Sequence, residues 1–272
     1  SGFTANGNGG SLGGLHKGFQ VFEDPTNTYV RKGLKQRCRE KFGETIEPAE
    51  HREAVLSDCV RYNRLPTGEF LVHRVLGHLR RSKAEKEFVF VFMVDPHDPY
   101  GAPPELERKF LGKDFEGKIR RRALWEINND YPEQERFSML AVYDASILYA
   151  DQAIGQLVDG LDELGLGDSA TLFITADHGE AFGEHGVYLH GYHFWDETIR
   201  IPLIAAGPRF EKKVDPRLTQ SLDVVATILD LARVEAGDLP GHSLLGPPPE
   251  DPRVISEYNE FGIHRQAIVG QR

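Results

Sequence analysis

Hydrophobic residues in the first half of the chain change from a helical period to a continuous run. Between residues 72 and 79, apolar residues recur at positions i, i+3, i+4 and i+7, which is the spacing of one helix face. Residues 88–94 are all apolar and rich in aromatic and β-branched types, a composition typical of a strand that is buried on both faces. The pattern therefore predicts a helix followed by an internal strand.

The alternation of helix and strand continues along the chain. An apolar stripe over residues 147–164 predicts a long amphipathic helix, and Gly165 and Gly167 are suited to end it. Residues 171–176 and 201–206 are further strand-like runs. The sequence therefore predicts the α/β class, with a mostly parallel sheet covered by helices on both faces.

The last part of the chain contains one more predicted helix and a proline-rich break. Ser221 is expected to cap a helix with an apolar stripe over residues 222–229. Three prolines at 247–249 predict a linker before two terminal strands. We therefore expect one α/β domain over residues 1–246, and the linker and start of a second subdomain over residues 247–272.

Two regions are expected to lie on the surface. Residues 101–136 are charged and interrupted by prolines, which indicates an excursion from the core. The first eighteen residues contain seven glycines but no G-x-G-x-x-G motif, so we expect irregular backbone there rather than a phosphate-binding loop.

Charge and composition exclude several classes of protein. Forty-two acidic residues outnumber 32 basic ones and give a formal net charge of −10. Nucleic acid is therefore not an expected partner, because a protein that binds it neutralises phosphates with basic residues. No apolar run approaches the roughly 20 residues that span a bilayer, so no membrane segment is expected. Cys38 and Cys59 are too few for a disulfide framework.

Residues with metal-binding chemistry directly follow one predicted strand. Asp177 and His178 come after the run at 171–176, and ligands in α/β sheets bind beyond the carboxyl ends of strands. A carboxylate beside an imidazole offers a divalent cation one oxygen and one nitrogen ligand. Two ligands are too few for a complete site, and a turn in which the Asp accepts backbone hydrogen bonds is the alternative.

Several histidines near the strand ends could transfer protons. His97 lies between two prolines that restrict the backbone, which suits a general acid or a donor to an anionic oxygen. A structural histidine that fixes the loop is the alternative. His185, His190 and His193 fall within nine residues, a density that suggests a site which binds an anion or metal and moves protons near neutral pH. Each of the three could be structural on its own.

Five segments between residues 88 and 245 carry motifs in a fixed order. The predicted strand at 88–94 leads into Asp-Pro-His-Asp-Pro-Tyr, and the long helix begins Tyr-Asp-Ala and ends Asp-Glu-Leu-Gly-Leu. The run at 171–176 leads into Asp-His-Gly-Glu-Ala-Phe-Gly-Glu-His-Gly. A His-Gly pair then precedes Ile-Arg-Ile-Pro-Leu, and a final helix is followed by Gly-His-Ser-Leu-Leu. Together they resemble the sulfatase family, which implies an alkaline phosphatase-like α/β fold and the hydrolysis of sulfate esters.

The resemblance also implies roles for individual residues. By position, Asp177 and His178 would bind a divalent cation, with Ca²⁺ expected and Mn²⁺ or Zn²⁺ as the alternatives. His97 would contact the sulfate or its leaving oxygen. Many family members have a lysine close to this chain's His-Gly pair, so His190, with His193 as the alternative, is expected to replace it as the catalytic cationic donor. Otherwise His193 is expected to bind substrate. The implied substrate is a small-molecule or carbohydrate sulfate ester.

One part of the family pattern does not occur in this sequence. Family members begin with a strand ending in paired aspartates that complete the metal site, followed by a C/S-x-P-x-R motif whose Cys or Ser becomes the formylglycine nucleophile. Neither Cys38 nor Cys59 is followed by such a motif, and no Gly-x-Ser-x-Gly elbow is present. We therefore expect a chain that is truncated at both ends and inactive alone, with the formylglycine outside it.

Two other functions are compatible with the same residues. The alkaline phosphatase superfamily, which includes the sulfatases, uses this scaffold for phosphonate or phosphodiester hydrolases and for phosphoglycerol transferases. The nitrogen of His178 favours such an enzyme, because nitrogen suits Mn²⁺ or Zn²⁺ better than Ca²⁺. A non-catalytic binding domain is the interpretation to prefer if the natural protein begins near Ser1. A sulfatase is the leading hypothesis.

Overall fold

The structure is a computed structural model, and it divides the chain into two compact units. One unit contains Ser1–Leu124 and Asp130–Gly165, and the other contains Trp125–Asn129 and Leu166–Arg272. The expected boundary after residue 246 falls inside the second unit and stays a prediction. Both cysteines lie outside the described residues. The structure describes residues 2–4, 19–20, 22–23, 68–121, 131–191, 193–235, 237–260 and 263–270.

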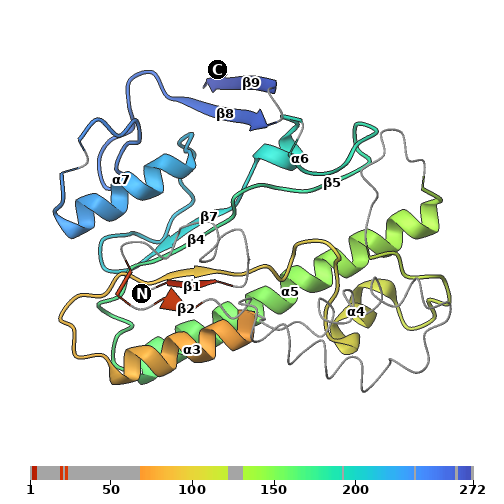
Figure 1. Cartoon of the computed structure of the whole chain (residues 1–272), viewed down its shortest axis with the longest axis horizontal. Coiled ribbons are helices and arrows are strands. Elements are labelled where there is room, and N and C mark those ends of the chain that lie inside the picture. Colours follow the sequence, from red (N-terminus) through yellow and green to blue (C-terminus); the bar gives the residue numbers. More distant parts are fainter. Residues whose placement is uncertain are drawn as a thin grey trace. The chain divides into compact units, whose positions relative to one another are not determined.

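The first unit contains a parallel sheet of three strands in the order β2-β1-β3 (Figure 1). The strands are β1 (Gly2–Thr4), β2 (Phe22–Glu23) and β3 (Phe90–Phe92). The last is shorter and less buried than the apolar run at 88–94 predicts, since the Phe88 and Phe90 side chains are 51% and 38% exposed. An apolar run records a tendency to be buried, whereas the length of a strand depends on the partners that pair with it.

The predicted helix around residues 72–79 is confirmed as α3 (Gly68–Arg81), which buries Leu71, Val72 and Val75. Its first backbone N–H, that of Gly68, donates to Asp95 Oδ2 at 2.8 Å. Asp95 therefore ties the start of α3 to the segment that follows β3, because the first N–H groups of a helix have no partner within the helix.

The long helix is also confirmed, and it begins earlier than its apolar stripe indicates. It is α5 (Glu133–Glu163), which starts after Pro132 and is followed by Gly165 with φ 70°. It packs against α3 and against α4 (Pro104–Leu111). A Cβ atom at Gly160 would lie 2.4 Å from the Leu76 side chain, so the missing side chain lets α3 approach α5 closely.

The second unit pairs its described strands in antiparallel fashion. β4 (Leu172–Thr175) pairs with β7 (Leu203–Ala206), and β5 (Ala181–Phe182) pairs with β6 (Tyr188–Leu189). The α/β class is thus confirmed, whereas the expectation of a mostly parallel sheet is not. Hydrophobic runs predicted where strands lie, but strand direction depends on which neighbour each strand meets.

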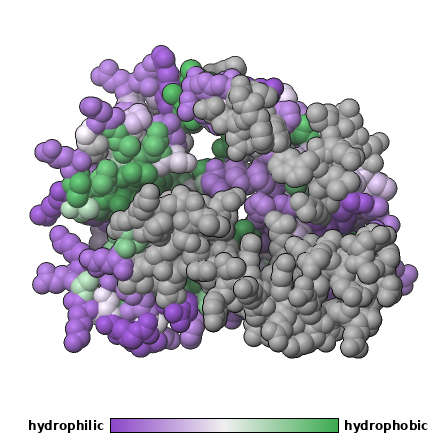
Figure 2. Space-filling view, viewed as in Figure 1, coloured by the Kyte–Doolittle hydropathy of each residue, from purple (hydrophilic) through white to green (hydrophobic). Residues whose placement is uncertain are grey.

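Helix α7 (Ser221–Ala232) is capped differently from the prediction. Gln220 is the N-cap, forming a reciprocal capping box with Asp223, and Ser221 is the first helical residue. The predicted stripe at 222–229 is buried only in part, since Ala226 is 5% exposed whereas Leu222 and Val225 are 38% and 44% exposed. Figure 2 shows hydrophobic residues gathered on the left, where Figure 1 places this helix.

Polar contacts cover the opposite side of α7. The Asp223 carboxylate accepts the backbone N–H of His242, and the Thr227 hydroxyl oxygen accepts that of Leu244, each at 2.8 Å. The two terminal strands are confirmed as an antiparallel hairpin of β8 (Arg253–Glu260) and β9 (Ile263–Gly270). Within the described residues, no helix has the length and apolar character to span a membrane.

Candidate functional site

A short hairpin in the second unit places a carboxylate against a histidine. In the β5–β6 pair, Ala181 is opposite Leu189 and Phe182 is opposite Tyr188, so the next pair outward is Glu180 and His190. His190 Nδ1 lies 3.1 Å from Glu180 Oε1, and the Glu180 side chain is only 4% exposed. The carboxylate accepts the Nδ1 proton and fixes the ring, so Nε2 is the nitrogen that can exchange a proton with a ligand.

The predicted metal ligands lie between β4 and this hairpin, and the ring of one is held in place by the backbone. His178 Nδ1 donates to the Gly179 carbonyl at 2.8 Å, a support typical of metal-binding histidines because it leaves Nε2 as the ligand atom. Nε2 lies 3.7 Å from Asp177 Oδ1. Two neighbouring ligands bound at about 2.0–2.4 Å to one cation are separated by a similar distance.

Asp177 and His178 therefore fit one side of a divalent metal site. Within the described ranges, no group of three or more histidine, cysteine or acidic side chains gathers to form a larger one. Among the described residues, this pair thus offers one oxygen and one nitrogen as potential ligands for a divalent cation.

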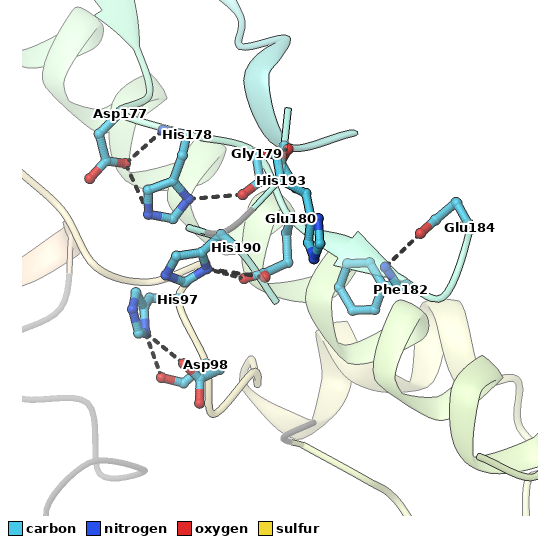
Figure 3. A network of polar contacts seen from close by, with 11 residues as sticks. His97, Asp98, Asp177, His178, Gly179, Glu180, Phe182, Glu184, His190 and His193 are labelled. Carbon is cyan, nitrogen blue, oxygen red and sulfur yellow. Dashed lines mark hydrogen bonds and ion pairs between the residues drawn. The ribbon is translucent and has the colours of Figure 1, made fainter. Parts of the chain in front are cut away.

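The ring of His190 also stacks on the ring of His178, with 3.8 Å between the centroids and 21° between the planes. Figure 3 shows Asp177 pointing to one edge of His178 and Glu180 pointing to His190. The structure thus brings three of the predicted residues together and adds Glu180, which sequence reasoning missed. The signal for Glu180 is its position, because residues 180 and 190 each lie five residues from His185, on which the hairpin register is centred.

Gly179 packs directly on α6 (Asp196–Ile199). Its N–H donates to the Thr198 carbonyl at 2.8 Å, and a Cβ atom would lie 2.1 Å from the Glu197 carbonyl oxygen. Thr198 is itself held by a bond from its hydroxyl to the His193 carbonyl at 2.9 Å. A glycine is therefore required after His178, because the chain there passes close to the α6 backbone. This contact fixes the position of the site relative to α6.

His185 and His193, the other two histidines predicted near His190, make different contacts. The His193 side chain is exposed. His185 lies at the hairpin tip, where its Nδ1 is 2.6 Å from Glu197 Oε1 and its ring stacks on Trp195. Partial burial raises the pKa of Glu197, but the hydrogen bond and positive charge of His185 outweigh it and hold that pKa below its usual range.

His97 belongs to the first unit, where it follows β3. Its Nδ1 is 2.7 Å from the Asp98 carbonyl oxygen and 3.1 Å from Asp98 Oδ1. The Asp98 side chain is 5% exposed, and its carboxylate orients the His97 ring. The ring itself is one-third exposed, which leaves it accessible to a ligand.

An ion pair with a buried carboxylate fixes the loop that carries His97. Glu107 on α4 receives two hydrogen bonds from the Arg121 guanidinium, and its Oε1 also accepts the Ala102 N–H at 2.8 Å. Arg121 Nη1 contacts the Tyr100 carbonyl, and the Ser146 hydroxyl on α5 bonds to both the N–H and the carbonyl of Gly101. Much of the described part of the predicted surface excursion at 101–136 is exposed, but Gly101, Ala102 and Glu107 are buried, and the pairing of Glu107 with Arg121 holds this part of the segment against the His97 loop.

Glu107→Gln is expected to lower the free energy of unfolding by about 1–3 kcal/mol, because the partly buried Arg121 guanidinium, which is 28% exposed, loses its counter-charge. Urea unfolding measures the change. Glu105→Gln, at an exposed position of the same helix, is the control and should change stability by less than about 0.5 kcal/mol. Equal unfolding midpoints for the two variants would contradict the assignment.

Comparison with known proteins places this geometry in a family. The family model described as Sulfatase matches residues 39–234. The sulfatase YidJ of Escherichia coli strain K12 is 27% identical over 206 residues, which cover 70% of this chain and 40% of that protein. The chain thus spans less than half the length of this curated relative.

Solved structures share the fold. The phosphonate monoester hydrolase of Agrobacterium radiobacter has a TM-score of 0.59 and 20% identity, covering 71% of this chain and 46% of that one. A structure solved with its substrate D-glucosamine-2-N,6-O-disulfate has a TM-score of 0.52 and 17% identity, covering 75% of this chain and 59% of that one. The family match extends over well more than half of the sequence, and the chain belongs to the sulfatase family.

Proposed function

We propose that the enzyme to which this chain contributes hydrolyses sulfate esters. The observation that carries the proposal is the arrangement of Asp177, His178 and His190. His178 Nε2 faces the Asp177 carboxylate, and the His178 ring stacks on the His190 ring. His190 in turn donates its Nδ1 proton to Glu180. Membership of the sulfatase family supports the choice of sulfate over other esters.

Each residue has a distinct part in this reaction. Asp177 and His178 would hold a divalent cation, which supplies positive charge to stabilise charge that develops on oxygen. His190 gives a proton to the leaving alcohol oxygen, and Glu180 stabilises the imidazolium form and keeps the ring in place. His97, oriented by Asp98, donates a hydrogen bond to the sulfate or the leaving oxygen, and His193 binds substrate. The nucleophile is the formylglycine expected outside this chain.

The family implies a divalent metal, and we propose calcium, with manganese or zinc as alternatives. The carboxylate of Asp177 suits any of them, whereas the His178 nitrogen suits manganese or zinc better. The substrate is proposed to be a sulfated carbohydrate or another small sulfate ester. The solved neighbour that holds a sulfated glucosamine supports the carbohydrate.

The test is turnover by the full-length enzyme carrying its formylglycine. Hydrolysis of an aryl sulfate and of sulfated sugars is expected. Absence of hydrolysis across this panel would overturn the proposal. The phosphonate monoester hydrolase neighbour favours one alternative, so kcat/KM is compared for an aryl sulfate and a phosphonate monoester with the same leaving group. Binding of sulfate esters without turnover of either class would indicate the non-catalytic domain instead.

Glu180→Gln is expected to lower kcat by about 10–100-fold on sulfate esters with poor leaving groups. His190 loses the carboxylate that orients its ring and stabilises its protonated form. Esters with good leaving groups need less proton transfer and should lose less. Glu184→Gln is the matched control, since it changes a carboxylate of the same hairpin that accepts the Phe182 N–H and is not bonded to a histidine within the described residues. Equal kcat values for the two variants on a poor leaving group would contradict the role of Glu180.

A further inference from the structure

The Trp195 indole lies at the start of α6 and is supported on one face. The imidazole of His185 lies flat on it, with 4.1 Å between the ring centroids and 7° between their planes. His185 is itself fixed by Glu197, since its Nδ1 lies 2.6 Å from Glu197 Oε1. Trp195 nevertheless remains 44% exposed, so much of the surface that His185 does not cover is open to a ligand.

The backbone of Trp195 is held by a buried residue. Thr198 is 5% exposed, and its hydroxyl lies 2.9 Å from the carbonyl oxygens of both Trp195 and His193. The Trp195 carbonyl also accepts the N–H groups of Thr198 and Ile199, at 2.8 Å and 3.1 Å. The indole is therefore fixed before a ligand arrives, and a rigid aromatic ring binds with little loss of conformational entropy.

Thr198 also connects Trp195 to the proposed site. Its carbonyl accepts the N–H of Gly179, the residue that follows His178. Trp195 comes three residues before Thr198, which is about one helical turn. The same Thr198 hydroxyl contacts the backbone of His193, the residue proposed to bind substrate. Trp195 therefore lies at the margin of the site, on the segment that carries the substrate-binding histidine.

A flat, rigid indole suits a particular class of ligand. One side of a pyranose ring presents C–H groups, and its hydroxyls lie around the edge. The face of an aromatic ring is electron-rich and attracts the partly positive hydrogens of C–H groups, and the contact removes apolar surface from water. An acyclic alkyl chain has no flat side to stack and gains less from the same ring. The indole therefore favours a sugar over an acyclic alcohol.

We infer that Trp195 is a platform on which the sugar ring of a sulfated carbohydrate stacks, and that it makes the site selective for carbohydrate over acyclic sulfate esters. The inference rests on the proposed function and names a residue that selects its substrate class. Trp195 recognises the sugar, whereas Asp177, His178 and His190 act on the sulfate group. Loss of the ring should therefore change which esters are preferred.

The experiment compares Trp195→Ala with the parent, both as the full-length enzyme carrying its formylglycine. The substrates are ethyl sulfate and the 6-sulfates of glucose, galactose and N-acetylglucosamine. All four release a primary alcohol, so the ratio of kcat/KM between a sugar sulfate and ethyl sulfate reports the contact with the ring. The parent should prefer at least one sugar sulfate, and Trp195→Ala should lower that ratio about tenfold. A parent without this preference, or an unchanged ratio in Trp195→Ala, would overturn the inference.

Two other replacements of Trp195 separate stacking from packing. Trp195→Phe keeps a flat aromatic ring and is expected to retain most of the preference for sugar sulfates. Trp195→Leu keeps an apolar side chain beside His185 but no ring face, so it should lose the preference as alanine does. Leu222→Ala removes an exposed apolar side chain from α7 of the same unit and is the control, with a parental ratio expected. Equal ratios in Trp195→Phe and Trp195→Leu would show that bulk matters and not stacking, which contradicts the platform.

Binding measurements separate this inference from the proposed function. If the parent hydrolyses no sulfate ester, the proposed function fails, while calorimetric Kd values for the same four esters still test the platform. Trp195→Ala should then raise the Kd of the preferred sugar sulfate about tenfold relative to that of ethyl sulfate. A parent that hydrolyses ethyl sulfate as well as the sugar sulfates would overturn the platform, although the enzyme would remain a sulfatase.

Discussion

Asp177→Asn is expected to lower the affinity of the enzyme for its divalent cation at least about 100-fold and to reduce turnover of sulfate esters to near background. The change keeps the size of the side chain and its bond from the His178 N–H at 3.1 Å, so the turn is preserved. It removes the anionic oxygen that lies 3.7 Å from His178 Nε2. The His178 imidazole would remain as a ligand, but the negative charge of Asp177 that balances the cation would be lost.

Calorimetric titration with Ca²⁺ and with Mn²⁺ measures this change and also tests which metal is preferred. Asp168→Asn is the control, because it alters an exposed aspartate in the same unit and should bind metal as the parent does. Chelation of the parent enzyme should reproduce the loss of turnover, and added metal should restore it. An Asp177→Asn enzyme with parental metal affinity would remove this residue from the metal site.

Gly179→Ala is expected to have a similarly large effect through the backbone. The added Cβ would lie 2.1 Å from the Glu197 carbonyl oxygen, 3.0 Å from the Glu197 carbonyl carbon and 3.3 Å from Thr198 Cα. All three are main-chain atoms, so no change of rotamer relieves the contact. The chain must separate from α6, which breaks the Gly179–Thr198 hydrogen bond and moves the carbonyl that orients His178.

We expect Gly179→Ala to lower the free energy of unfolding by about 2–4 kcal/mol and to weaken metal binding about tenfold or more. Urea unfolding and calorimetry measure the two effects. Gly155→Ala is the matched control, since a Cβ atom there meets nothing within 4 Å on helix α5, and alanine should raise stability by about 0.5–1 kcal/mol. Parental stability and metal affinity in Gly179→Ala would show that the close contact with Glu197 is not required.

Features that depend on neighbours in sequence could be predicted from the sequence. The helical period at residues 72–79 and the stripe at 147–164 correspond to α3 and α5, because a helix face repeats every three to four residues. Asp177 and His178 were predicted as a pair of metal ligands because they are adjacent and follow a strand. Motif order also identified the family, which the match over residues 39–234 confirms.

Other features depend on contacts between distant residues. The stripe of α7 is apolar throughout, yet Leu222 and Val225 are exposed while Ala226 is buried. The polar contacts of Asp223 and Thr227 show which side meets the rest of the unit. Glu107 and Arg121 look like surface charges in sequence, yet they meet across fourteen residues against the His97 loop. Charge and periodicity describe each residue alone, whereas burial depends on its partners.

The sequence by itself determined the family, the positions of the main helices and strands, and the residue types that the site needs. The tertiary structure decided how those residues act together. It paired Glu180 with His190 across a hairpin, stacked His190 on His178, and required a glycine at 179 where the α6 backbone passes. These relations follow from hairpin register and backbone packing, because both are set by long-range contacts that no local pattern encodes.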